Sequence, residues 1–120
     1  MDASFQNGLT ALAGGAQVGA TKIGTVGGSG AATMNRFTTV ASAADSAVLP
    51  PANAGLSYIV KNAAAANSMN VFPAAFSQGG QVGGDAINAL SANTAFAVAA
   101  GKTAMFVCMV NGTWDVLLTA

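Results

Sequence analysis

The most regular feature of the chain is a series of short runs of β-branched, aromatic and other apolar residues, each bounded by glycine, proline or asparagine. Such runs favour strands, and the residues that bound them are typical of turns. No segment has a sustained helical periodicity. The pattern predicts an all-β fold, either a small β-sandwich or a jelly-roll-like barrel of short antiparallel strands. We expect strands at residues 36–40, 45–49, 56–61, 70–72, 95–98, 103–110 and 113–119.

The segment of residues 1–35 differs from the rest because it is rich in glycine and alanine. Glycine at this density disfavours a helix. We interpret the segment as an extended arm that pairs only briefly with other strands, with a flexible leader as the alternative. The chain therefore divides into a Gly/Ala-rich N-terminal arm at residues 1–35 and a β domain at residues 36–120.

The strongest local signal is Asn111-Gly112, which lies between two β-rich runs. This dipeptide predicts a two-residue hairpin turn in which both residues have positive φ. A two-residue turn also sets the register of the two strands, and that register predicts a face that belongs to the core. The pairs expected on the core face are Met109 with Trp114, Val107 with Val116 and Met105 with Leu118.

The opposite face of the same hairpin is also largely apolar. A strand that is apolar on both faces is normally covered on both sides, and a chain this small has little of its own to supply a second cover. We therefore expect another subunit to cover this face. The candidate subunit-interface residues are Phe106, Cys108, Val110 and Leu117.

The composition also bears on assembly. Only 7% of the 120 residues are charged, and four basic residues balance four acidic ones, whereas an ordinary soluble domain has about 25% charged residues. Two explanations stand. Small amide and hydroxyl side chains keep the surface in solution, or much of the surface is buried against other subunits.

Most side chains that catalysis needs are missing. The chain has no histidine and one cysteine, which excludes a histidine base, a disulfide within one chain and a Cys/His zinc site. The four acidic residues are widely scattered. Gly101-Lys102-Thr103 resembles the end of a phosphate-binding loop, but Phe96 stands where that loop needs its first glycine, so we interpret a tight turn. We expect no enzyme activity, no catalytic residue, no cofactor, no metal ligand and no small-molecule substrate.

Other classes of partner are excluded on similar grounds. Four cations spread along the chain cannot neutralise enough phosphates to hold nucleic acid. No apolar run approaches the ~20 residues of a membrane-spanning helix, and the N-terminal residues lack the pattern of a secretory signal. We therefore expect neither nucleic acid nor a membrane as a partner, and a protein made in the cytoplasm.

Several short sequence motifs occur in a fixed order between Leu9 and Ala120. Together they resemble a module of tailed-bacteriophage structural proteins. The chain departs from that module by an apparent insertion at residues 76–83 and by Asp115, where related chains often carry histidine. The motifs include Gly14-Gly15-Ala16-Gln17, Asn35-Arg36-Phe37-Thr38-Thr39-Val40, Ser46-Ala47-Val48-Leu49-Pro50-Pro51, Asn70-Val71-Phe72-Pro73, Gly84-Asp85-Ala86-Ile87-Asn88-Ala89-Leu90 and Gly112-Thr113-Trp114.

The resemblance implies a small, β-rich virion protein similar to capsid decoration, or cement, proteins. Such proteins sit as trimers over the junctions between major capsid subunits. The expected protein is a homotrimer on the capsid surface that binds the phage major capsid protein, with residues 1–35 as the capsid contact. The alternative is a head or tail fibre module that recognises a host surface through the glycine-rich loop at residues 77–84. An enzyme or small-molecule binder is the third and least supported hypothesis.

Overall fold

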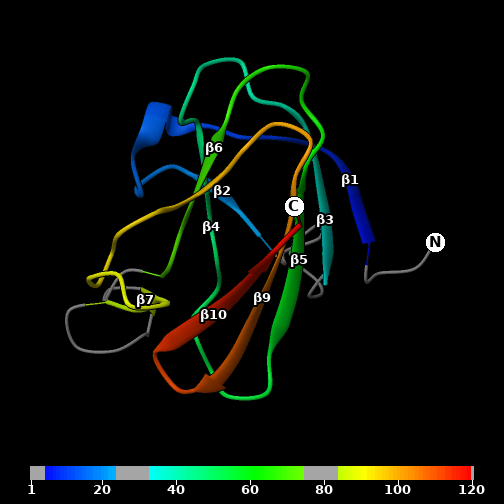
Figure 1. The fold of residues 1–120 in the computed structure, drawn as a ribbon. Coiled ribbons are helices and arrows are strands. Elements are labelled where there is room, and N and C mark those ends of the chain that lie inside the picture. Colours follow the sequence, from blue (N-terminus) through cyan, green and yellow to red (C-terminus); the bar gives the residue numbers. More distant parts are fainter. Residues whose placement is uncertain (1–4, 24–32, 75–83, 120) are drawn as a thin grey trace.

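The structure, a computed structural model, describes residues 5–23, 33–74 and 84–119, with only the backbone of Phe5. Within these ranges the chain forms ten strands and one short 3₁₀ turn, η1 (Ala13–Gly15). The strands form a six-stranded sheet, sheet A, and a four-stranded sheet, sheet B (Figure 1). Sheet A contains, in spatial order, β1 (Phe5–Thr10), β3 (Met34–Thr39), β5 (Ser57–Asn62), β9 (Thr103–Val110), β10 (Thr113–Leu118) and β7 (Ala86–Ile87). Sheet B contains β2 (Thr21–Lys22), β4 (Ser46–Val48), β6 (Met69–Phe72) and β8 (Phe96–Val98).

The expected all-β class is confirmed, and the expected strands are present with ends that differ by one or two residues. The purely antiparallel arrangement is wrong. Strands β1, β3 and β5 are parallel to one another in sheet A, and so are β2, β4 and β6 in sheet B. The physical reason lies in the chain path. From β1 to β8 successive strands alternate between the two sheets, so a strand of one sheet serves as the crossover between parallel neighbours of the other.

The core lies between the two sheets. The side chains of strand β5 alternate between the core and the outer face, because Tyr58 and Val60 are buried whereas Ile59 and Lys61 are only half-buried. The ring of Tyr58 meets Trp114 edge to face, with 5.8 Å between centroids. Asn62 joins the two sheets, since its side-chain amide donates to the carbonyl of Val98 in β8 at 2.9 Å.

The described part of the segment expected to form an arm belongs to this sandwich. Strand β1 pairs with β3 along its length, and β2 pairs with β4. Ala11 and Ile23 are buried and pack in the same core cluster as the later strands. The separate arm is therefore not present at residues 5–23, because their apolar side chains help to fill the space between the sheets.

The hairpin turn at Asn111-Gly112 is confirmed, with Val110 paired to Thr113. The expected backbone is wrong at one position, since Gly112 has a φ of 91° and Asn111 is not among the positive-φ residues. A turn of this kind matches the twist of a hairpin less well than the expected one. The side chain of Asn111 has another role, because its Oδ1 accepts a hydrogen bond from the backbone of Ala54 at 2.8 Å.

The expected register of the hairpin is also wrong beyond the first pair. Thr113 pairs with Val110 but Asp115 pairs with Val107, so β9 holds one extra residue opposite Trp114. Because of this bulge, Trp114 shares the inner face with Phe106 and not with the expected Val107. The buried residues of β9 are consequently Ala104, Phe106 and Cys108, whereas Met105 and Met109 are exposed.

The integration of the N-terminal segment can be tested by Ile23→Ala. The side chain of Ile23 is buried in the shared core, so its truncation should lower the free energy of unfolding by about 2–5 kcal/mol. Val18→Ala is the matched control, because Val18 is 86% exposed and should change stability by less than about 0.5 kcal/mol. Urea unfolding followed by tryptophan fluorescence measures both. Equal stabilities for the two variants would contradict this account of the segment.

Candidate functional site

The structure divides the four predicted interface residues into two pairs. Phe106 and Cys108 face the core and are fully or almost fully buried. Val110 and Leu117 remain exposed, by 67% and 65%. The prediction treated these residues as one face, and the extra residue in β9 separates them. Phe106 and Cys108 therefore cannot form a subunit contact in this fold, whereas Val110 and Leu117 are available for one.

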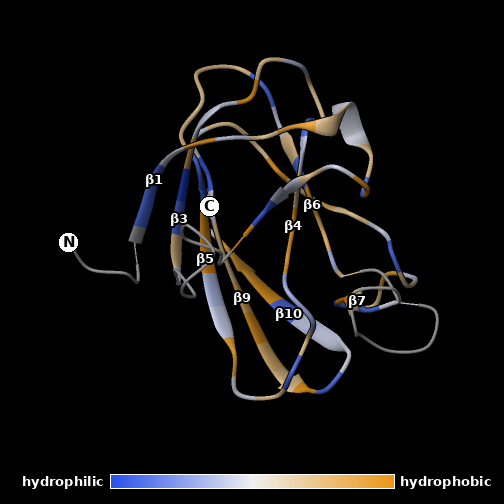
Figure 2. Ribbon diagram, turned by 180° about the vertical axis from the view of Figure 1, so that it is seen from behind, coloured by the Kyte–Doolittle hydropathy of each residue, from blue (hydrophilic) through white to orange (hydrophobic). Residues whose placement is uncertain are grey.

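An apolar row crosses four strands on the outer face of sheet A. Met34 in β3 is paired with Ile59 in β5, Ile59 with Met105 in β9, and Met105 with Leu117 in β10. Met34, Met105 and Leu117 are exposed, and Ile59 is half-buried. We call these four residues the outer row. Figure 2 shows β9 as hydrophobic along most of its length, whereas β10 is hydrophobic in one part and hydrophilic or neutral in the rest.

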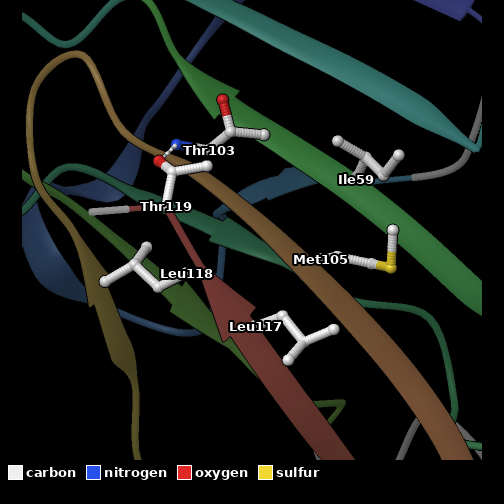
Figure 3. A pocket seen from close by; sticks show the side chains of 6 residues that line it. All are labelled: Ile59, Thr103, Met105, Leu117, Leu118 and Thr119. Carbon is white, nitrogen blue, oxygen red and sulfur yellow. Dashed lines mark hydrogen bonds between the residues drawn. The ribbon is translucent and has the colours of Figure 1, made fainter.

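A shallow apolar pocket of about 260 Å³ lies at the β10 end of the outer row. Figure 3 shows the side chains of Leu117, Met105 and Ile59 following one another across β10, β9 and β5. One end of the pocket is lined by Thr103 and Thr119, where the backbone N–H of Thr103 donates to Oγ1 of Thr119 at 3.0 Å. Side chains lining the pocket come from Ile59, Thr103, Met105, Leu117, Leu118 and Thr119.

The outer row has a cationic border on one side. Arg36 lies directly opposite Lys61, and Lys61 lies opposite Thr103. Arg36 donates to Oδ1 of Asn7 at 2.9 Å, and Lys61 donates to the carbonyl of Gly101 at 2.8 Å. Both acceptors are neutral oxygens, so neither hydrogen bond pairs its cation with a negative charge.

The described residues along the border on the other side of the outer row include no cation and one anion. Ser57 is paired with Val107, and Val107 with Asp115. Asp115 is exposed at the β10 end of this border. The outer row thus separates two cations from one anion across the same face.

The tip of the β9–β10 hairpin forms a second exposed apolar surface. Met109 is 69% exposed and lies beside Val110. The backbone of the tip is fixed, since Gly112 donates its N–H to the carbonyl of Ala52 at 2.9 Å. An apolar surface on a well-anchored turn is suited to contact with another protein.

The remaining aspartates of the described chain hold loops. Asp45 accepts hydrogen bonds from the backbone N–H groups of Gly14 and Ser42, at 2.8 Å and 3.1 Å. Asp85 is fully buried and accepts from the N–H of Ala52 at 2.8 Å. These two carboxylates are committed to backbone amides, which is a structural role.

The described residues contain no group of three or more His, Cys, Asp or Glu side chains placed to hold a metal ion. Gly101-Lys102-Thr103 forms the expected tight turn, in which the N–H of Lys102 donates to the carbonyl of Ala99 before β9 begins. Across the described ranges, no helix has the length and hydropathy needed to cross a lipid bilayer. The predicted recognition loop at residues 77–84 lies outside the described residues except for Gly84.

Sequence reasoning missed most of the outer row. It placed Met105 in the core and gave no role to Met34 or Ile59. The available signal was the period of two in a strand, which places Ile59 on the face away from Tyr58 and Val60. The alignment of Ile59 with Met34 and Met105 depends on pairing between distant segments, which a single sequence does not reveal. Comparisons of the chain with protein-family models, with curated proteins and with solved structures find no match.

The burial of Cys108 leads to a prediction about its reactivity. Desolvation raises the pKa of the Cys108 thiol above its ordinary value, and its Sγ donates to the carbonyl of Val110 at 3.2 Å. Because the thiolate is the reactive form, native protein at pH 8 should react with a thiol reagent such as dithionitrobenzoate at least about a hundredfold more slowly than protein in urea. Rapid, complete labelling of the native protein would contradict this placement of Cys108.

Proposed function

We propose that this protein is a structural component of a bacteriophage virion, a decoration protein that binds the outside of the head and stabilises contacts between major capsid subunits. The observation that carries the proposal is the outer row, an apolar strip four strands wide that the fold leaves uncovered. An uncovered strip of this extent favours a protein that works through contacts with other chains.

The surface chemistry supports a role in binding over catalysis. Two of the three described aspartates are buried against backbone amides, and the single cysteine is buried in the core. What remains exposed among the described residues is mainly small polar side chains with methionine, valine and leucine, and a few charged ones such as Arg36 and Asp115. Contacts made by the small polar side chains lose little side-chain entropy on association. Repeated over a symmetric shell, weak contacts of this kind act multivalently.

The homotrimer expected from the resemblance is part of the proposal. The hairpin tip is the best-supported place for the three-fold contact, because Met109 and Val110 are both about two-thirds exposed there. Val110 is also one of the two predicted interface residues that stay accessible in the fold.

The capsid contact is proposed for the exposed part of the N-terminal segment. Leu12 and Val18 flank η1 and are 50% and 86% exposed. They replace the free arm expected from the sequence, since residues 5–23 are fixed in the sandwich. A rigid contact of this kind needs no ordering of the segment on binding.

The copy number of the protein in the virion tests the proposal. The ratio of this protein to the major capsid protein should equal one or a simple fraction of one, as a shell-wide lattice requires. A handful of copies per particle would contradict decoration and would favour the alternative, a head or tail fibre module that recognises the host surface.

The role of the outer row is tested by Met105→Asp. An unpaired neutral polar group in a buried apolar contact costs about 1–3 kcal/mol and a carboxylate costs more, so binding through this face should weaken at least about tenfold to a hundredfold. The matched control is Ala97→Asp, an exposed strand residue of sheet B. Decoration of protein-depleted heads, measured by gel band intensity, should fall for the first variant only. Equal decoration by both variants would contradict a role for the outer row.

A further inference from the structure

We propose that the outer face of sheet A is a two-fold contact with a second copy of this chain. The inference rests on the proposed use of this face as a contact with other protein chains, and it adds the identity of the partner and the symmetry of the contact. The argument comes from the positions of the charges around the outer row.

Arg36 and Asp115 lie at opposite corners of the four-stranded area, β3 to β10, that the outer row crosses. From β3 to β10 there are three steps between neighbouring strands, a distance of about 14 Å. The row that holds Arg36 crosses β9 at Thr103, and the row that holds Asp115 crosses β9 at Val107. These residues are four positions apart along β9, which is about 13 Å. The two charges are thus displaced equally along and across the strands.

This arrangement is self-complementary under a two-fold axis. Consider an axis in the plane of the face, through its centre and perpendicular to the line from Arg36 to Asp115. Rotation by 180° about this axis places Arg36 of each copy over Asp115 of the other, so two ion pairs form at once. A two-fold contact uses the same patch on both subunits and therefore needs such self-complementarity.

The centre of the same face is apolar. The axis passes between Ile59 and Met105, the two middle residues of the outer row, which are paired neighbours. In the two-fold contact these residues pack against their own counterparts. Because the axis is diagonal to the strands, the two sheets cross at close to a right angle, which is one of the two arrangements that packed sheets adopt.

The distribution of charged side chains on the described surface favours a second copy of this chain as the partner. Arg36 and Lys61 are direct neighbours of like charge, an unfavourable arrangement. Of the three described aspartates Asp115 is the exposed one, since Asp45 and Asp85 are buried. A second copy brings its Asp115 to the cationic border, where it is attracted to both cations.

A two-fold contact leaves the proposed trimer intact. A trimer uses two different surfaces of each subunit, whereas a two-fold contact uses one surface twice. The outer face would then join copies from neighbouring trimers, and the hairpin tip would hold each trimer together. In solution the two-fold contact doubles the mass of a single chain, whereas a trimer carries three such faces and associates to at least twice its mass.

Charge reversal and its rescue test the inference on the purified full-length protein. Arg36→Asp places two carboxylates against each other at both corners of the contact, and Asp115→Arg places two cations there. Each single variant should weaken the doubling of mass at least about tenfold in sedimentation equilibrium. The double variant, Arg36→Asp with Asp115→Arg, restores opposite charges at both corners and should recover doubling to within about threefold of the parent protein. The control is Lys22→Asp, an exposed cation of sheet B, which should leave doubling unchanged.

The mass of the dissociated single variants separates this inference from the proposed trimer. If the dissociated variants have the mass of one chain, the proposed trimer is contradicted and the two-fold contact is unaffected. If they have the mass of three chains, both proposals are supported. The inference is overturned if the parent protein shows no doubling, if the single reversals do not change it, or if the double variant stays as weak as the single ones. It is also overturned if both single variants fail to decorate heads while their mass in solution is unchanged, because the face would then bind the shell.

Discussion

One extra residue in strand β9 decides which side chains of this protein are available for contact. Cys108 and Met109 lie together opposite Trp114, and this bulge directs the largest side chain of the chain into the core. The indole N–H of Trp114 is buried without a hydrogen-bond partner among the described residues, at a cost of about 1–3 kcal/mol. Burial of the ring against Tyr58 offsets that cost. The same bulge leaves Met105 and Leu117 on the outside, where they complete the outer row.

The alternation of strands between the two sheets sets the other half of the outer row. Because β3 and β5 are parallel neighbours separated by β4 in the opposite sheet, Met34 and Ile59 come to lie side by side although they are far apart in sequence. The core between the sheets fixes both strands through their inward residues, such as Phe37 and Val60. The strands that carry the outer row are therefore held in place by the packing beneath them before any partner binds. A preformed surface of this kind loses little entropy on association.

Period-two patterns and turn residues predicted the later strands and the all-β class, because both signals are local. Strand β1 was missed because its sequence includes Gly8, which adopts a φ of 76°, and several polar residues. The parallel pairing was missed because it joins distant segments. Of the four predicted interface residues, Val110 and Leu117 are exposed on the C-terminal hairpin. The prediction included Phe106 and Cys108 because no residue in the sequence marks the bulge that turns them inward.

The native methionines offer the most direct test of the central claim, that the outer face of sheet A is a contact between protein chains. Oxidation of methionine by peroxide follows solvent exposure, and the rate at each site can be read by peptide mass spectrometry in dilute and in assembled protein. Met34 and Met105 should be oxidised several-fold more slowly in the assembled protein, whereas Met69, which is fully buried in one chain, should react slowly in both. Equal rates for Met105 in dilute and assembled protein would contradict the account.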